Sequence, residues 1–168
     1  DSSEEIIEVN HKAKDKKVEY LTPFNDKYHG YNIALTDGLR ANTSWSNQLW
    51  QGWDGKNMEV IVDLGEKQKI QKISLGLLAD QGSWIFFPKK IQFFSSNNGS
   101  DYQQIYETEI EATSKLKNAA IKDFGNSFLY LNARYIKVVA TPIEALPEWH
   151  SAAGDTGVWI FADEIIVE

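Results

Sequence analysis

The fold is decided first by residues 58–65, which read MEVIVDLG. From Met58 to Leu64 every second side chain is apolar, with Glu59 and Asp63 between them. This period of two predicts a β-strand with one face in the core. Gly65 is expected to end the strand.

The same pattern continues on both sides of this stretch. The basic run 12–17 leads into residues 18–21 and is typical of a solvated strand edge. Further strand-like runs cover residues 73–77, 91–95, 128–131, 135–140 and 165–167. Residues 107–122 are ambiguous, and we interpret them as irregular strand and loop.

Asn98-Gly99 lies between two of the predicted strands. Asn-Gly supplies the positive φ angles of a type I′ turn, so we expect a hairpin whose return strand is residues 102–106. With no convincing long helix, the pattern predicts an all-β chain folded as an antiparallel β-sandwich. Two long segments, 36–56 and 141–157, interrupt the strands and are expected to carry function or surround an ion.

Composition narrows the function classes. The chain has 168 residues, no cysteine and a net charge of −7 with 17 basic and 24 acidic side chains. This size suits one domain, and the acidic balance argues against broad binding to nucleic acid or anionic membranes. No segment is apolar and long enough to insert into a membrane, and no signal peptide opens the sequence. Because the chain starts at Asp1, we expect it to be a piece of a larger protein.

Motifs for catalysis are missing. The sequence has no G-x-G-x-x-G, P-loop, H-E-x-x-H or G-x-S-x-G motif, and its three histidines are widely spaced. A calcium site is more plausible, because residues 34–44 combine Asp37 with a tight turn and several side-chain oxygens. Asp-Gly followed by Asn-Thr-Ser is also ordinary turn chemistry. Asp163 and Glu164 offer a distant second carboxylate.

Several stretches, taken in order, resemble the discoidin, or coagulation factor 5/8 type C, domain family. They are LTDG (35–38), TSW (43–45), VIVDLG (60–65), SSNNGSDY (95–102), ARYIKV (133–138) and ADEI (162–165). The likeness covers residues 10–168, so residues 1–9 are expected to be a flexible lead-in. It implies a discoidin-like jelly-roll β-sandwich (galactose-binding-domain-like), similar to family 32 carbohydrate-binding modules.

A narrower likeness involves residues 51–53 (QGW), 80–88 (DQGSWIFFP) and 158–165 (VWIFADEI). These resemble the C-terminal domain of bacterial family 20 β-hexosaminidases (chitobiases). The resemblance implies a non-catalytic accessory domain of a secreted, periplasmic or cell-surface bacterial glycoside hydrolase. Its expected partners are a glycan and the catalytic domain of the parent enzyme, and the domain itself is expected to be a monomer.

The resemblance also implies one structural calcium ion. Its side-chain ligands would be Asp37 and Glu164, with Thr43 or Asn42 as a further oxygen. The choice between these two stays open, because Trp45 follows Asp37 by one residue more than in the common family pattern. Backbone carbonyls near Ala34, Leu39 and Ala162 would complete the shell.

In family 32 modules a loop aromatic ring stacks on the sugar while polar side chains hold its hydroxyl groups. We interpret Trp45, Trp53 and Trp159 as core residues. The sugar-binding candidates, chosen from loop placement and not from the family match, are Trp149, His150, Trp84, Arg40, Trp50 and Asp80. The ligand is expected to be a terminal galactose-type or N-acetylhexosamine-type sugar.

Two other hypotheses remain. The domain could pack on its catalytic domain without binding sugar, in which case an exposed apolar patch is expected. A discoidin-type protein- or lipid-adhesion role is disfavoured by the net charge of −7 and by the lack of apolar spikes flanked by bases in the sequence.

Overall fold

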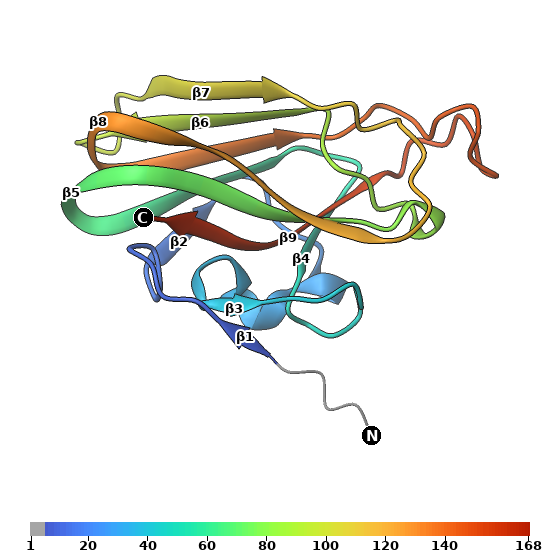
Figure 1. Cartoon of the computed structure of the whole chain (residues 1–168), viewed down its shortest axis with the longest axis horizontal. Helices are drawn as coiled ribbons and strands as arrows, with labels where there is room; N and C mark the ends of the chain where they lie inside the picture. Colours follow the sequence, from blue (N-terminus) through green and yellow to red (C-terminus); the bar gives the residue numbers. More distant parts are fainter. Residues whose placement is uncertain (1–5) are drawn as a thin grey trace.

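The chain forms a two-layer β-sandwich built around two long, bent strands (Figure 1). The structure, a computed structural model, describes residues 6–168. The long strands are β5 (Met58–Ala79) and β8 (Ala120–Thr141). They run antiparallel along their whole length, with Met58 opposite Ala140 and Ala79 opposite Ala120. Each gives one half to each layer.

The first layer contains β2 (Lys17–Tyr20), the first half of β5, the second half of β8, β6 (Lys90–Ser96) and β7 (Gln103–Glu109). The second contains β4 (Gln51–Asp54), β9 (Trp159–Val167), the second half of β5 and the first half of β8. This confirms the predicted β-sandwich. Among the described residues, no helix is long and apolar enough to span a membrane.

The alternation of apolar and polar side chains along β5 explains which residues form the core. Met58, Val60 and Val62 from one half of β5 are fully buried, as are Ile73 and Leu75 from the other half. They pack in one apolar cluster between the layers. Burial stabilises the fold by roughly 25 cal/mol for each Å² of apolar surface removed from water.

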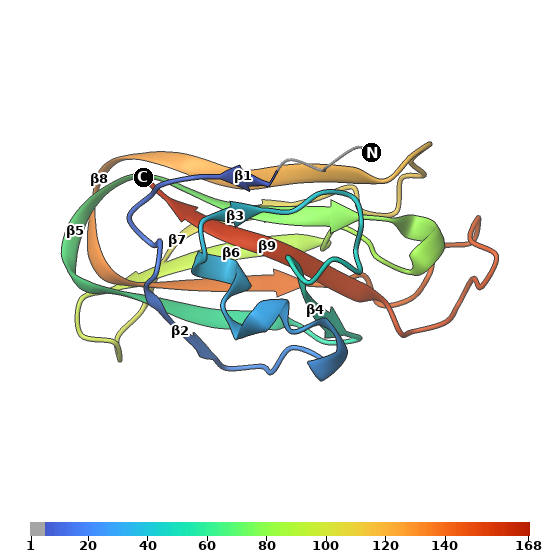
Figure 2. The same cartoon turned by 90° about the horizontal axis from the view of Figure 1, so that it is seen from below.

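The bend of the long strands corrects one prediction. Gly65 does not end the strand; β5 continues through it, and its pairing with β8 shifts register between Asp63 and Gln68. A second shift leaves β8 with extra residues opposite Gln71, and there Leu129 is 83% and Tyr130 93% exposed. The C-terminus lies at this same end, whereas the long loops gather at the opposite one (Figures 1 and 2).

The predicted hairpin is confirmed, but its turn type is wrong. β6 and β7 pair with Ser95 opposite Gln103, so the connection is longer than a two-residue turn. Gly99 has a positive φ of 77°, while Asn98 does not belong to the positive-φ residues that a type I′ turn requires. The Asn98 side chain instead accepts hydrogen bonds from the N–H groups of Ser100 and Asp101, both at 2.9 Å.

Short elements cover the lower side of the sandwich in Figure 1. They are the 3₁₀ turns η1 (Asp26–Tyr28), η2 (Gly30–Asn32) and η3 (Ala34–Thr36) and a two-stranded sheet of β1 (Ile7–Glu8) with β3 (Leu39–Arg40). The expected flexible lead-in 1–9 is therefore paired at Ile7 and Glu8; its residues 1–5 lie outside the described residues.

Candidate functional site

Loops from three parts of the chain meet at the end of the sandwich opposite the strand bends (Figures 1 and 2). They are residues 80–89, which include the 3₁₀ turn η4 (Gln81–Ser83), the connection 110–119 and the connection 142–158. Four of the six sugar-binding candidates lie here: Trp149, His150, Trp84 and Asp80.

Trp149 is the exposed ring of this end. Its side chain is anchored, because the indole N–H donates a 2.8 Å hydrogen bond to the Thr113 carbonyl. The ring packs 6.0 Å from the ring of Phe86, and Lys115 Nζ lies 5.7 Å from its centroid. The residue nevertheless stays 37% exposed. A large apolar ring held in one orientation with an open surface suits stacking on another molecule.

His150 is buried and holds the loop together. Its Nδ1 accepts a hydrogen bond from the N–H of Ala152, and its Nε2 lies 2.7 Å from the carbonyl oxygen of Gln81. A nitrogen facing a carbonyl must donate, so the ring is the neutral tautomer with the proton on Nε2. Both ring nitrogens are used inside the protein. His150 is therefore a support for Trp149 and does not offer a hydrogen bond to a sugar.

Trp84 and Asp80 frame the η4 turn. Trp84 is half-buried, with its ring 6.3 Å from the ring of His150 and a left-handed backbone at φ 67°. Asp80 pairs its backbone with Ile85 in both directions, and its side chain makes no hydrogen bond to the turn that it precedes. Both residues thus remain at the candidate site.

The two other candidates are corrected by the structure. Trp50 is fully buried and donates its indole N–H to the Asn42 carbonyl at 2.8 Å, so it has no face for a sugar. The Arg40 guanidinium lies away from the loop end, where it donates to Asp163 Oδ2 at 2.9 Å and to both carboxylate oxygens of Asp123. The guanidinium N–H groups of Arg40 are therefore used in ion pairs within the protein.

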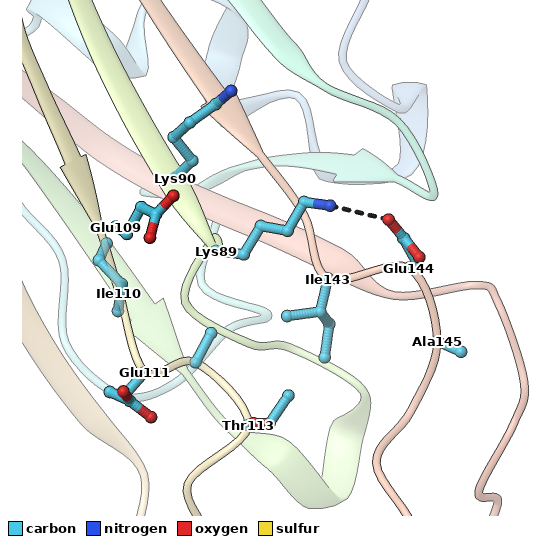
Figure 3. A pocket seen from close by; sticks show the side chains of 10 residues that line it. Lys89, Lys90, Glu109, Ile110, Glu111, Thr113, Ile143, Glu144 and Ala145 are labelled. Carbon is cyan, nitrogen blue, oxygen red and sulfur yellow. Dashed lines mark hydrogen bonds and ion pairs between the residues drawn. The ribbon is translucent and has the colours of Figure 1, made fainter.

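A hollow of about 770 Å³ lies at the same end of the sandwich, and Trp149 is joined to its wall through Thr113. Thr113, whose carbonyl holds the indole, is one of its lining residues. In Figure 3 the Lys89 side chain reaches across to Glu144, with a 2.9 Å ion pair, and Ile143 lies next to this pair. Glu109 and Glu111 line the opposite side. The hollow thus combines carboxylates, an ammonium group and apolar surface, which suits a polyhydroxylated ligand.

Sequence reasoning missed a second aromatic feature. Trp45 and Trp159, expected in the core, are only half-buried, whereas Trp53 is fully buried as predicted. The two half-buried rings line a small cavity of about 40 Å³ together with Tyr28, Ser83, Ile85 and Phe161. The sequence predicts Trp159 in the core, but it could not show that this residue is the first of its strand.

Asp37 and Glu164 are brought together far from the loop end. Asp37 follows η3 and Glu164 lies on β9, and the two carboxyl groups are near enough for each to shift the pKa of the other. Glu164 Oε2 accepts a hydrogen bond of 2.8 Å from the Gly38 N–H and lies 2.6 Å from His11 Nε2. Burial, reinforced by the nearby Asp37 carboxylate, raises the pKa of Glu164 to about 10, and burial raises the pKa of Asp37 to about 6.

One observation supports a cation bound between Asp37 and Glu164. Glu164 Oε1 is buried and has no hydrogen-bond partner among the described residues. A buried carboxylate oxygen without a partner is costly, and a cation beside two carboxyl groups would remove that cost. His11, on the other carboxylate oxygen, was not among the sequence candidates.

The remaining expected ligands fit less well. The Asn42 side-chain oxygen already accepts hydrogen bonds from the Ser44 N–H and from Asn47 Nδ2, and Thr43 is exposed. The Ala34 carbonyl accepts only a long 3.5 Å bond from the Asp37 N–H among the backbone contacts, so it retains capacity. Leu39 lies on β3 and Ala162 on β9, the elements that flank the two acids. No group of three or more His, Cys, Asp or Glu side chains among residues 6–168 is arranged to hold a metal.

Gly76 on β5 leaves room for the side chains of Asp163 and Arg40. A Cβ atom there would lie 2.0 Å from Asp163 Oδ1 and 2.6 Å from Arg40 Nη2. The close approach allows the Arg40–Asp163 pair, which fixes β3 to β9 beside Glu164.

Comparison with known proteins agrees with this architecture. The model of the F5/8 type C domain family matches residues 22–156. No curated protein matches this chain.

Three similar solved structures illustrate the fold. A chitosan-binding module 2, in complex with chitotriose, from a chitosanase/glucanase of Paenibacillus sp. IK-5 has 16% identity and a TM-score of 0.58, covering 94% of this chain and 98% of that one. A fucose-binding module of Streptococcus pneumoniae has 17% identity and a TM-score of 0.59, covering 94% of each chain. The CBM32-1 module of a family 31 glycoside hydrolase from Clostridium perfringens has 18% identity and a TM-score of 0.57, covering 92% of this chain and 94% of that one.

Proposed function

This chain belongs to the F5/8 type C, or discoidin, domain family, and from that premise we propose that it is a non-catalytic module that binds carbohydrate at its loop end. The similar modules named above bind chitosan or fucose according to their descriptions. At this level of identity they share the fold with this chain, so the ligand has to be argued from its own residues.

Trp149 is the observation that carries the proposal. Its ring is half open, and its orientation is fixed by Thr113, Phe86 and Lys115 before any ligand arrives. A sugar that stacks its apolar face on this ring gains contact without paying to order the side chain. His150, with both nitrogens satisfied, keeps the supporting loop in place.

The neighbouring hollow supplies groups for the hydroxyls. Glu109, Glu111 and Glu144 are acceptors, and Lys89 is a donor. Hydrogen bonds to charged groups contribute roughly 1.5–3 kcal/mol each, before desolvation is subtracted. A shallow site of this kind corresponds to about micromolar to millimolar affinity. We expect the ligand to be a terminal galactose-type or N-acetylhexosamine-type sugar.

The parent protein is proposed to be a secreted bacterial glycoside hydrolase of the β-hexosaminidase type. The residues that support this are 51–53, 80–88 and 158–165, which resemble the C-terminal domain of chitobiases. The full-length parent is then expected to release p-nitrophenol from the aryl N-acetylglucosaminide. Hydrolysis of other glycosides but not of this one would reject the hexosaminidase assignment and leave the binding module intact.

Calcium is proposed as a structural component of the module. Asp37 and Glu164 would hold the ion, with backbone carbonyls near Ala34, Leu39 and Ala162 and an oxygen of Thr43 or Asn42 as further ligands. A bound ion would neutralise the two carboxylates and tie the segment after η3 to β9. Glu164 Oε1, which is buried and has no hydrogen-bond partner among residues 6–168, supports this proposal.

The test is a titration of the 168-residue domain with galactose, N-acetylgalactosamine, N-acetylglucosamine and chitobiose, followed by tryptophan fluorescence with calcium present. We expect saturable quenching by one of these sugars. No response up to tens of millimolar would reject sugar binding.

A second candidate function rests on a different surface. Ile6, Ile7, Tyr31 and Ile33 are each more than half exposed and line a hollow of about 500 Å³. Such a patch favours a domain that packs on its catalytic neighbour. Replacing Ile7 and Ile33 by Ser would then speed proteolytic release of the domain from the full-length parent, while Trp149→Ala would not.

A further inference from the structure

We propose that the cavity between Tyr28, Trp45 and Trp159 is a second subsite, which takes the acetamido methyl group of an N-acetylhexosamine. This inference rests on the proposed function and deepens it. It concerns a cluster of rings distinct from Trp149, contributed by η1, the segment before β4 and the start of β9.

The three rings form a preassembled aromatic cluster. Tyr28 is its centre, with ring centroids 5.8 Å from Trp45 and 5.2 Å from Trp159, both in edge-to-face geometry. Phe161 and Ile85 are buried and form the floor, while the exposed Ser83 lies at the rim. Edge-to-face contacts of this kind favour fixed rings, so the cavity does not depend on a ligand for its shape.

Size and lining select the group that fits. A cavity of about 40 Å³ exceeds the ~10–15 Å³ needed to hold one water molecule, so a methyl group fits in it. Four of the six lining residues are aromatic, the fifth is Ile85 and the sixth is Ser83, so a small apolar group in the cavity would contact the rings. A methyl group meets both conditions.

The charge around the cavity disfavours a cationic ligand. Aromatic rings also bind ammonium groups, but Lys27 Nζ already lies 5.6 Å from the centroid of the Tyr28 ring. No carboxylate is among the described residues that line the cavity. An acetylated amino sugar therefore fits better than a free amino sugar.

The η4 turn links the cavity to the loop that carries Trp149, because Ser83 lines the cavity and Trp84 follows it in the chain. The N–H of Trp159 donates to the Trp84 carbonyl at 2.9 Å, and the ring of Trp84 contacts His150, the neighbour of Trp149. Ser83 lies next to Trp84 in the chain and presents a hydroxyl at the rim, where an acetamido oxygen would accept its hydrogen bond. The loop end thus offers a stacking ring and, across the η4 turn, a pocket for the acetyl group.

The test varies the acyl group on one sugar. Calorimetric or NMR titrations compare N-acetyl-, N-formyl- and N-butanoylglucosamine and free glucosamine on the wild-type domain. The acetyl derivative should bind about 4-fold more tightly than the formyl derivative, the amount expected for burying one carbon. The butanoyl derivative should bind more weakly than the acetyl derivative because the cavity is too small for it.

A rim variant assigns the effect to the cavity. Ser83→Leu closes the opening from an exposed position, so the fold should keep its melting temperature. It should remove the preference for the acetyl over the formyl derivative and weaken the binding of both, because both carry the amide oxygen that the Ser83 hydroxyl would contact. Ser100→Leu, an exposed serine on the β6–β7 connection at the other end, is the matched control and should keep the preference.

The outcomes separate this inference from the proposed function. Equal binding of the acetyl and formyl sugars, or unchanged preference in Ser83→Leu, overturns the subsite while sugar binding stands. Tighter binding of free glucosamine overturns the methyl assignment in favour of an ammonium group. No saturable binding of any derivative overturns both proposals.

Discussion

The indole N–H of Trp149 donates a 2.8 Å hydrogen bond to the carbonyl oxygen of Thr113. The two residues belong to different loops, so this contact joins the 110–119 connection to the 142–158 connection and joins the ring to the wall of the hollow that Thr113 lines. Binding at this end of the sandwich therefore depends on the position of the ring as well as on its presence.

Trp149→Phe separates these two contributions. The variant keeps an aromatic face but loses the hydrogen bond, worth about 1 kcal/mol, so sugar affinity should fall about 5-fold. The melting temperature should change little because the residue is partly exposed. Calorimetric titration measures the effect. Wild-type affinity in this variant would show that the contact with Thr113 does not position the ring.

Asp37→Asn tests the proposed calcium site. In the wild type, calcium at 100 times its Kd should stabilise the fold by ~2.7 kcal/mol, which raises Tm by about 5–10 °C. The variant should lose most of this shift. Thermal unfolding with calcium and with a chelator measures it.

Asp26→Asn is the matched control, because Asp26 is exposed on η1 and belongs to none of the expected ligands. It should keep the full calcium-dependent shift. A wild-type Tm that is the same with calcium and with chelator would reject the metal site.

Gly76→Ala should destabilise the fold strongly. Its Cβ would overlap Asp163 Oδ1 and separate the buried carboxylate from Arg40. Breaking a buried charge pair costs about 3–5 kcal/mol, so Tm should fall by roughly 6–20 °C. Gly82→Ala has open space around the new methyl group and should melt close to the wild type. Equal Tm values for the two variants would contradict the packing described for Gly76.

The pair of Asp63 and Arg134 predicts a pH effect on stability. Hydrogen bonds from Arg134 Nε and Nη2, at 2.9 and 3.1 Å, hold the pKa of the Asp63 carboxyl below its ordinary value. A lowered folded-state pKa stabilises the fold above the unfolded value of ~3.9 and stops doing so as pH falls through the folded value.

Asp63→Asn should therefore melt slightly below the wild type at pH 7, and the difference should vanish in strong acid. Thermal melts between pH 2 and 7 provide the comparison. A difference between the two proteins that stays constant over this range would show that the ion pair contributes nothing.

Much of the fold could be predicted because the alternation of apolar and polar residues indicates which face of a strand is buried. Residues 58–64 and 73–77 read correctly as strands, yet nothing local showed that they are halves of one strand, because Gly65 is compatible with a bend and with an end. The turn at 97–100 was assigned from the Asn-Gly pair alone. Its actual shape depends on side-chain acceptors such as Asn98 Oδ1, which accepts hydrogen bonds from two backbone N–H groups of a longer connection.

The site could be predicted only in part, since the sequence does not show which aromatic rings reach the surface. Trp149 was expected on a loop and is exposed, but Trp50 occurs in an equally loop-like stretch and is fully buried. Trp45 and Trp159 were assigned to the core and proved to be half-buried rim residues. The family resemblance names Asp37 and Glu164 together as metal ligands, and this assignment stays a prediction, while His11 approaches Glu164 only through the tertiary fold.

The central claim is that a sugar stacks on Trp149, and calorimetry on one variant tests it most directly. The sugar that binds best to the wild type is titrated into Trp149→Ala, with Tyr130→Ala as the control because that ring is 93% exposed at the opposite end of the sandwich. We expect Tyr130→Ala to bind as the wild type does and Trp149→Ala to lose measurable binding while it still folds and melts cooperatively. Wild-type affinity in Trp149→Ala would contradict the account.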